Sequence, residues 1–389
     1  MQPLTQPSAY QPSSSLFSQS YGEARAKFLD AATEAGARPL SFRNPHAAGP
    51  AGEPLFLDAV WFGPTDAPTV LVNTSGTHGA EGYAGSAAQL AWMKDGGHRA
   101  LPAGVAVLLV HAVNPFGFAW GLRGTENNVD LNRNFIDFQQ SAPENALYAQ
   151  LHELLCPSVL DKASLNRLMR EGGRLIAKHG QWALEDAISR GQYTHPDGYH
   201  FGGAAPEWSN LTLRRLFGET LSSAKRIGLI DWHSGPTGDG ELIHLCFSEP
   251  GEQSFNRLAQ WWGQETLDPD QVNEKWGSKR PTRRGILLWG LQQMVGPETE
   301  VIGGVIEFRS AQPKSDATQA LRTTMLERWL RFEGGLSAPE APRLLMEIRE
   351  DYAPRRRSWQ DKVVANALAT YEQTLAGLAA WQNEPDMER

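Results

Sequence analysis

Short apolar runs alternate with segments of helical spacing along most of the chain. Residues 105–110 are nearly all β-branched or leucine, which is typical of a strand buried on both faces. Five further runs predict strands: 54–62 at a sheet edge, 69–73, 227–232, 242–247 and 300–308. Because such runs alternate with helical segments, the pattern predicts an α/β fold. We expect a mixed, largely parallel central sheet flanked by helices, in three layers.

The helical segments fall between and after these runs. Helices are predicted over 21–35, 82–94, most of 143–191, and from a cap at Ser209 or Asn210 to about Lys225. Near the C-terminus, apolar residues recur every three or four positions and mark an amphipathic helix: Val364, Leu368, Tyr371, Leu375 and Leu378.

The chain shows no internal repeat and no linker. We therefore predict one domain over 21–389, with helical insertions at about 140–225 and C-terminal helices. Residues 1–20, rich in Gln, Pro and Ser, are predicted to form a flexible arm. They lack a basic segment followed by an apolar one, and the run at 101–113 is too short to cross a bilayer. The predicted location is the cytoplasm.

Composition narrows the classes of function. With 41% hydrophobic and 21% charged residues, the 389-residue chain is an ordinary globular protein. Its two cysteines, Cys156 and Cys246, exclude a disulfide scaffold and an all-cysteine zinc site. A net charge of −8 argues against nucleic acid or an anionic membrane as a partner. The ten histidines remain as candidates for chemistry.

Sites in open α/β sheets form beyond the carboxyl ends of the strands. His78 and Glu81 follow the run at 69–73 in the only H-x-x-E of the chain. A spacing of three puts both side chains on one face of a helical turn, where they can share one Zn²⁺. The alternative is a turn histidine beside a glutamate that begins a helix.

His233 ends the run at 227–232 and is a candidate third ligand. Two histidines and one carboxylate leave a fourth position for water, which is the catalytic arrangement for zinc. Asp231 points to the same side of the strand and can orient a ligand. The alternative for His233 is a core histidine hydrogen-bonded to backbone.

Glu307 lies at the end of the apolar run at 300–308. A carboxylate there is costly to bury unless it is paired or has a catalytic role. Burial also raises its pKa toward the range of a general base. The alternative is a salt bridge with Arg309 or another arginine.

The polar segment after residue 110 contains further candidates. Arg123 can stabilise an oxyanion, and Arg133 offers a bidentate fork for a carboxylate beside the amide of Asn132. The alternative is a polar loop pinned by Asn and Asp turns.

These motifs, in this order, resemble the zinc carboxypeptidase superfamily. The resemblance covers roughly residues 54–310 and is densest in N-P-x-G-F at 114–118 and D-L-N-R-N-F at 130–135. The wording is closest to a bacterial branch that shares features with succinylglutamate desuccinylase and aspartoacylase. The resemblance implies one Zn²⁺ per chain and seven site residues: the ligands His78, Glu81 and His233, the general base Glu307, the carbonyl-polarising Arg123, and the carboxylate-binding Asn132 and Arg133.

The chain departs from the family at two positions. Phe116 replaces an Asp that binds no metal, and no Tyr lies between His233 and Glu307, where digestive carboxypeptidases carry a substrate-capping one. The segment 191–203, rich in Gly and aromatic residues, is either a pocket lid or a surface loop.

The missing Tyr favours an amide hydrolase acting on a small peptide or N-acyl amino acid with a free carboxylate. The alternatives are an N-acyl amino acid deacylase rather than a peptidase, and a metal- or ligand-binding relative without catalysis. Eight other candidates are expected to lie outside the metal site, the basic ones in a solvated loop: His195, His200, His244, Lys275, Lys279, Arg280, Arg283 and Arg284.

Overall fold

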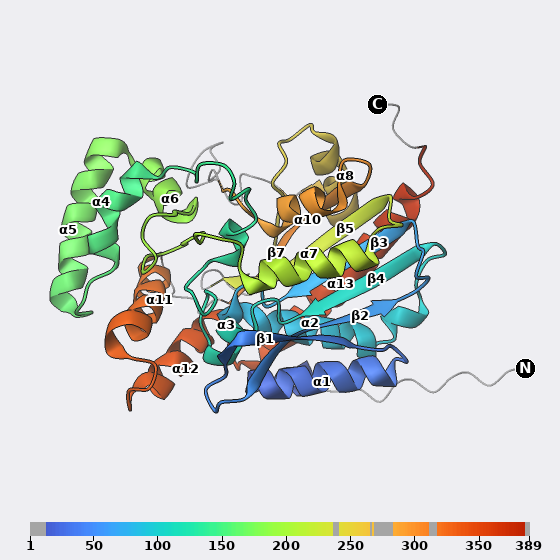
Figure 1. Cartoon of the computed structure of the whole chain (residues 1–389), viewed down its shortest axis with the longest axis horizontal. Coiled ribbons are helices and arrows are strands. Elements are labelled where there is room, and N and C mark those ends of the chain that lie inside the picture. The colour runs from blue at the N-terminus through green and yellow to red at the C-terminus, as the bar shows by residue number, and fades with distance from the viewer. Residues whose placement is uncertain (1–12, 236–240, 265–266, 268–282, 311–316, 386–389) are drawn as a thin grey trace, which may run out of the picture.

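The computed structural model describes residues 13–235, 241–264, 267, 283–310 and 317–385. Over these residues the centre of the molecule is one seven-stranded sheet (Figure 1). Its strands are β1 Leu40–Ala48, β2 Pro54–Phe62, β3 Thr69–Ser75, β4 Val105–His111, β5 Arg226–Gly235, β6 Leu242–Leu245 and β7 Glu300–Arg309. They lie in the order β1-β2-β4-β3-β5-β7-β6. The four inner strands β4, β3, β5 and β7 are parallel, and the remaining pairings are antiparallel.

Helices cover both faces of the sheet. The longer ones are α1 Tyr21–Glu34, α2 Gly82–Lys94, α4 Ala146–Leu155, α5 Lys162–His179, α6 Gln181–Ser189, α7 Trp208–Thr220, α8 Gln253–Trp262, α10 Leu287–Val295, α11 Ala317–Trp329, α12 Ala341–Tyr352 and α13 Arg357–Trp381. Short helical turns are η1 Ser13–Ser15, η2 Gly79–Glu81, η3 Gly97–Arg99, α3 Pro115–Trp120, η4 Leu131–Arg133 and η6 Leu330–Gly334. Helices α1, α2, α8 and α13 pack on one face of the sheet, whereas α7 and α10 pack on the other. The predicted three-layer α/β fold is therefore confirmed.

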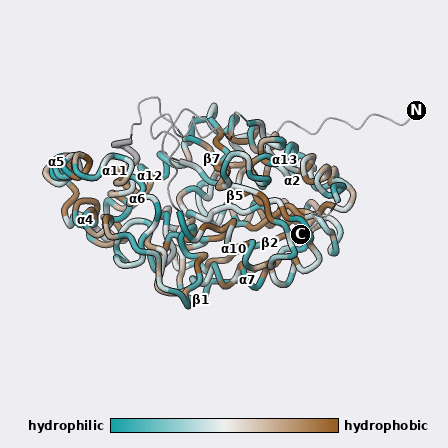
Figure 2. The backbone as a smooth tube through the Cα atoms, turned by 90° about the horizontal axis from the view of Figure 1, so that it is seen from above, coloured by the Kyte–Doolittle hydropathy of each residue, from teal (hydrophilic) through white to brown (hydrophobic). Residues whose placement is uncertain are grey.

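The core follows the alternation of side chains along each strand. In β3, Leu71 packs with the α2 and α13 layer, while Val70 and Val72 pack with the α7 and α10 layer. Both faces of the inner strands are covered, which explains why their sequences read as continuous apolar runs. The more hydrophobic segments lie toward the middle of the molecule, around β2, β5 and α10 (Figure 2).

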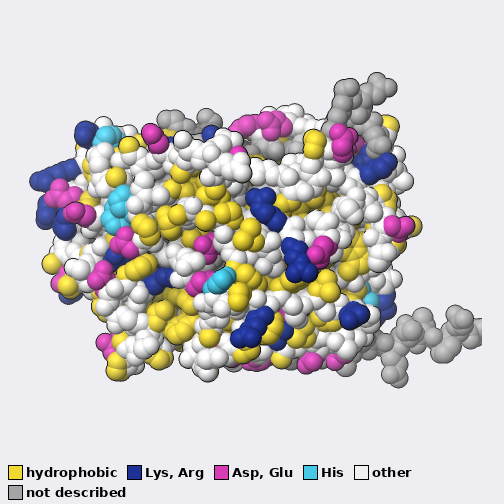
Figure 3. Space-filling view, in the orientation of Figure 1, with side chains coloured by type: hydrophobic (Ala, Val, Ile, Leu, Met, Phe, Trp, Pro, Cys, Tyr) yellow, Lys and Arg dark blue, Asp and Glu magenta, His cyan; other side chains and the backbone are white. Residues whose placement is uncertain are grey.

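A helical appendage extends one end of the molecule. Helices α4, α5 and α6 form their own apolar cluster, joined by Met325 of α11, at the left of Figure 1. Charged side chains of both signs are scattered over the face seen in Figure 3, with a dense group over α5. The predicted insertion at 140–225 thus contains this appendage, but its last part, α7, belongs to the main sheet.

Three details of the prediction are wrong. The strand at 54–62 is not at the edge, because β1 pairs with its outer side. Strand β1 was not predicted, because most of its side chains are exposed or partly exposed and form no apolar pattern. Helix α7 begins after Glu207, since the Asn210 amide is used to hold Asn134 rather than to cap the helix.

The prediction of a flexible arm over residues 1–20 is wrong for its last part. Residues 1–12 lie outside the described residues, but Leu16 and Phe17 are buried in the core beside α1 and α13. No helix of the described chain is long and apolar enough to span a bilayer. The cytoplasmic location stays a prediction.

The order of the strands places a crevice at the middle of the sheet. From β3 the chain moves outward on one side to β4, and later returns to the other side of β3 to form β5. The connections after β3 and β5 therefore leave in opposite directions, which makes their carboxyl ends a topological switch point. His78 follows β3, and His233 lies near the end of β5.

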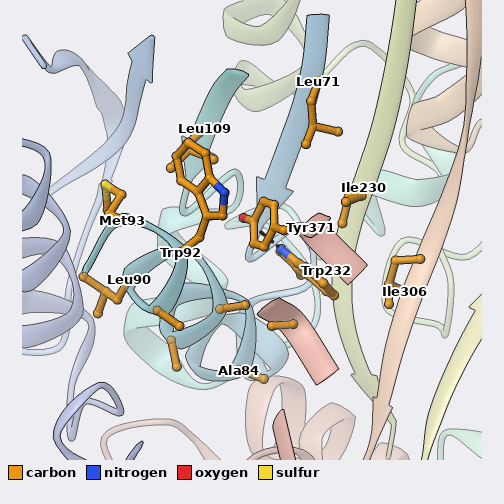
Figure 4. Packing of buried hydrophobic residues seen from close by; sticks show 14 of the residues in the cluster. Leu71, Ala84, Leu90, Trp92, Met93, Leu109, Ile230, Trp232, Ile306 and Tyr371 are labelled. Atoms are coloured by element: carbon orange, nitrogen blue, oxygen red, sulfur yellow. Dashed lines mark hydrogen bonds between the residues drawn. The ribbon is translucent and has the colours of Figure 1, made fainter. Parts of the chain in front are cut away.

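Below this crevice, one polar contact ties the sheet to α13. The Tyr371 hydroxyl lies among apolar side chains of β3, β5 and α2 (Figure 4). It donates to Asn73 Oδ1 at 2.6 Å and accepts from Trp232 Nε1 at 3.4 Å. Since Tyr371 is fully buried, water cannot replace either partner.

We predict that Tyr371→Phe lowers the free energy of unfolding by about 1–2 kcal/mol, because Trp232 Nε1 loses its acceptor in the core. Urea unfolding of the full chain measures the change. The matched control is Tyr83→Phe, since Tyr83 is also buried and its hydroxyl makes no hydrogen bond with the described residues. Equal effects of the two substitutions would contradict the assigned role of the Tyr371 contact.

Candidate metal centre and active site

The turn that carries His78 is held against a second turn, the one before Arg123. The Ala80 N–H donates to the Leu122 carbonyl at 3.1 Å, and the Asn114 N–H donates to the Gly76 carbonyl at 2.8 Å. A Cβ on Gly79 would lie 1.8 Å from the Gly117 carbonyl carbon, so the two backbones pass at a distance that only glycine permits. The glycines around His78 therefore serve this close approach.

His78, Glu81 and His233 converge at the switch point. His78 Nδ1 lies 3.1 Å from Glu81 Oε1, and His233 Nδ1 lies 2.8 Å from Glu81 Oε2. All three side chains are buried, and one ligand atom from each lies within 4.8 Å of the others. No other three His, Cys, Asp or Glu residues of the described chain form such a group.

The second ring nitrogen, Nε2, of each histidine contacts a further carboxylate. His78 Nε2 lies 3.0 Å from Asp130 Oδ1, and His233 Nε2 lies 2.7 Å from Asp231 Oδ2. Asp231 is fixed in turn by the hydroxyls of Thr74 and Thr77. A carboxylate that accepts from Nε2–H leaves the Nδ1 lone pair free for a metal and sets the tautomer and ring orientation.

Charge holds this cluster together. Burial would lower the pKa of His233, but the Asp231 and Glu81 carboxylates outweigh it and raise that pKa to about 10. Burial likewise opposes ionisation of Glu81, yet the two histidines bring its pKa below the usual value. The Glu81 carboxylate therefore stays ionised, and the His233 imidazole holds a proton that faces it. A divalent cation can bind such a pair in place of that proton.

The donor set fits zinc. Tetrahedral Zn²⁺ with ligands at 2.0–2.1 Å needs ligand atoms roughly 3.4 Å apart. The His–Glu separations of 2.8 and 3.1 Å are close to this spacing. Two imidazoles and one carboxylate, each with an outer hydrogen-bond partner, form the set that leaves a coordination position open for water.

Arg123 borders the triad. Its Nη1 donates to Glu81 Oε1 at 3.2 Å, and its Nε donates to Asp130 Oδ2 at 3.1 Å. The side chain is 23% exposed, and carboxylates anchor its guanidinium. Its contact with a substrate oxygen stays a prediction.

Asn132 and Arg133 follow Asp130 in the turn η4. The Asn132 amide nitrogen donates to Asp231 Oδ2 at 3.3 Å and lies 3.3 Å from His233 Nε2, while its oxygen accepts from the Leu287 N–H. Asn132 therefore positions the Asp231–His233 pair, and its contact with a substrate carboxylate stays a prediction.

The Arg133 guanidinium is buried, and only some of its N–H groups are hydrogen-bonded. Nη1 donates to the Asn132 carbonyl at 2.6 Å and Nη2 donates to the Ser189 carbonyl, while Nε has no hydrogen-bond partner. None of the described carboxylates forms an ion pair with Arg133, and burial lowers its pKa to about 10.

Glu307 lies beside the triad on the neighbouring strand. It is paired in register with His233. Among the described residues no arginine forms an ion pair with it, and Arg309 pairs with Glu241 instead. No hydrogen bond from the described residues reaches the Glu307 carboxylate. Burial and the negative charge of Glu81 raise its pKa, partly opposed by His233, Arg283 and Arg123.

Space for the Glu307 carboxylate depends on Gly235. A Cβ at that position would lie 1.9 Å from Glu307 Oε1. The glycine after His233-Ser234 thus keeps room for a carboxylate, a purpose that the sequence pattern did not reveal.

The segment 191–203 is packed against the site. The Phe201 carbonyl accepts from the Asp130 N–H, and Tyr193 Oη donates to the Arg133 carbonyl at 2.6 Å. His200 Nδ1 lies 2.9 Å from Asp130 Oδ2. The segment is therefore a wall of the site rather than an ordinary surface loop, and His200 acts through Asp130.

The sequence did not predict the surroundings of three groups near the site. No sequence pattern indicates the partners of Asp130 and Glu327, and Arg283 was assigned to a solvated loop. That assignment is wrong for Arg283, since its Nε is buried, burial lowers its pKa, and the charges of Glu307, Arg123 and Asp130 act on it. Lys275, Lys279 and Arg280 of the same cluster lie outside the described residues.

A fold of this class with a His–Glu–His triad at the switch point defines a candidate metal-dependent enzyme. The chain belongs to the DUF2817 family, described as a protein of unknown function, whose profile matches residues 17–366. No curated protein matches the chain.

Solved structures similar to this chain include the carboxypeptidase A of Helicoverpa armigera. It is 14% identical at a TM-score of 0.45, with 86% of this chain and 74% of that chain covered. Bovine thrombin-activatable fibrinolysis inhibitor is 11% identical at a TM-score of 0.43, with 90% and 98% covered. A glutaminyl cyclase from an Acidobacteriales bacterium is 12% identical at a TM-score of 0.40, with 98% and 99% covered. Carboxypeptidases are thus among the similar structures, as the sequence resemblance predicted, but likenesses this distant say nothing about the reaction.

Glu327 on α11 provides a test of the charge distribution. The residue is 8% exposed, its carboxylate accepts the Arg123 N–H at 2.5 Å, and burial raises its pKa from 4.5 to about 6. The folded state therefore binds the proton more tightly than the unfolded state. The stability from this protonation is fully present below pH 4.5 and is lost as the pH rises through 6.

We predict that Glu327→Gln, which keeps an acceptor for the Arg123 N–H, removes this loss. The stability of the variant relative to the wild type should rise by about 2 kcal/mol between the two pH limits. Urea unfolding at a series of pH values measures the difference. A difference that does not change with pH would contradict the raised pKa of Glu327.

Proposed function

We propose that this chain is a zinc-dependent hydrolase that cleaves an amide bond next to a free carboxylate in a peptide or N-acyl amino acid. One observation carries the proposal: the partly buried Glu307 carboxylate stands in register with His233 of the candidate triad, and no described residue donates a hydrogen bond to it. A protein that only bound a metal would have no use for it.

The zinc ion would be held by His78, Glu81 and His233, and would supply a Lewis acid that activates water and polarises the scissile carbonyl. Glu307 takes the proton from the attacking water and later delivers it to the leaving nitrogen. Its raised pKa suits the first transfer, since a stronger base accepts the proton more readily.

The arginines bind the substrate in this proposal. Arg123 donates to the carbonyl oxygen as negative charge develops there, because its guanidinium is already fixed by Glu81 and Asp130 on a partly exposed side chain. The buried Arg133, which lacks an ion pair within the described chain, receives the free carboxylate. The wall at 191–203 keeps the Arg133 side chain in place, since Gly191 packs directly on its Cδ.

Replacing the base separates catalysis from metal binding. We predict that Glu307→Gln retains one zinc ion per chain while kcat falls by about 10²–10⁴, because only the proton transfers are lost. His233→Ala should lose the zinc itself. Elemental analysis, together with hydrolysis of a panel of dipeptides and N-acyl amino acids, measures both.

The matched control is Glu219→Gln, an exposed carboxylate on α7 that should leave zinc content and hydrolysis unchanged. Full hydrolysis by the zinc-loaded Glu307→Gln variant would refute the mechanism. Stoichiometric zinc in His233→Ala would refute the ligand set. The panel also separates a peptidase from a deacylase by which substrates turn over.

A second substitution moves the base without removing it. In Gly235→Ala the new methyl group overlaps the end of the flexible Glu307 side chain, so the carboxylate shifts while the backbone stays in place. We predict an unchanged zinc content and a fall in kcat of about 10²-fold, as displacement by about 1 Å can cause. Gly218→Ala, which meets open space on α7, is the control. Wild-type kcat in Gly235→Ala would mean that the position of Glu307 does not matter.

A further inference from the structure

Two guanidinium groups at the site make no ion pair with a carboxylate of the described residues. The Nε atoms of Arg133 and Arg283 are both buried and make no hydrogen bond, and neither side chain forms an ion pair with the described residues. Arg123, in contrast, donates to Glu81 and Asp130. Because burying a cation without a counter-ion is costly, two such groups at one site call for an anion that binds them both.

The two arginines lie on segments that pack directly on each other. The Phe135 N–H donates to the Gly285 carbonyl at 3.1 Å, and the Leu287 N–H donates to Asn132 Oδ1 at 2.9 Å. Gly285 has a φ of +69°, and a Cβ there would lie 2.5 Å from the Arg133 carbonyl oxygen. Only glycine allows this approach, so it fixes Arg283, two residues earlier, beside the turn of Arg133.

The charges around Arg283 belong to the candidate active site. Those that act on it are the negative Glu307 and Asp130 and the positive Arg123. Arg283 in turn disfavours the charged form of Arg133, which means that the two cations repel each other. One carboxylate would neutralise one of them, whereas a substrate with two carboxylates would neutralise both.

We propose that Arg133 and Arg283 form a two-point anion site that selects substrates with two carboxylates, one bound at each arginine. In an amino acid product, the second carboxylate is the side chain of Asp or Glu. Arg283 is then a specificity-determining residue. The inference rests on the proposed function for the reaction, but the anion site itself can be tested without hydrolysis.

The hydrolysis test compares substrates that differ only in charge. The zinc-loaded full chain is assayed on N-acetylglutamate and N-acetylglutamine, and kcat/KM is expected to favour the glutamate by at least about 100-fold. Arg283→Gln should lower this ratio at least about 30-fold, and Arg283→Lys, which keeps the charge without the planar fork, should lower it less. Arg284→Gln, at the exposed neighbouring arginine, is the control and should leave the ratio unchanged.

Two results would overturn the proposal. One is an unchanged ratio in Arg283→Gln. The other is an equal loss on both substrates, which would mean that Arg283 grips the carboxylate that they share.

The binding test uses glutarate and glutaramate, which differ by one carboxylate. Calorimetry on the zinc-loaded chain should show glutarate binding at least about tenfold more tightly, with the preference lost in Arg283→Gln. If this preference is present but no substrate is hydrolysed, the proposed function fails and the anion site stands. If substrates are hydrolysed but glutarate has no advantage, the anion site fails and the hydrolase stands.

Discussion

The Glu81 carboxylate is the point at which the segments of the site are joined. Its oxygens lie 3.1 Å from His78 Nδ1 on the same turn and 2.8 Å from His233 Nδ1 on β5, and they accept from the Ser234 N–H and from Arg123. A buried carboxylate depends on such partners to offset its loss of hydration. The strand order, the glycines around His78 and the turn before Arg123 all act to bring these partners together.

A second layer of carboxylates fixes the first. Asp130 and Asp231 each accept from the outer nitrogen of one histidine, and Asp130 also accepts from Arg123 and His200. This layer orients both rings so that their Nδ1 atoms face Glu81. The negative charge is therefore concentrated around the triad, while Arg133 and Arg283, which form no ion pair with the described residues, lie at its border. That division suits a cation in the centre and an anionic substrate beside it.

Much of this arrangement could be predicted from sequence because it follows strand ends. The inner strands are buried on both faces, so their apolar runs were unmistakable, and His78, His233 and Glu307 follow directly from them. The exposed β1 carried no such pattern. The Asn210 amide was read as a helix cap because its true partner, Asn134, is distant in sequence. The prediction for Arg283 is wrong for a related reason. Its basic neighbours indicate a solvated loop, and only the contact of Gly285 with Arg133 places it at the site.

The central claim, that His78, Glu81 and His233 bind zinc, is tested most directly by diffraction at the zinc absorption edge from crystals of the full chain. The account predicts one anomalous difference peak at about 2.0–2.2 Å from Nδ1 of both histidines and from a Glu81 oxygen. A map in which the two imidazoles still contact the Glu81 carboxylate directly, with zinc bound elsewhere or not at all, would contradict it.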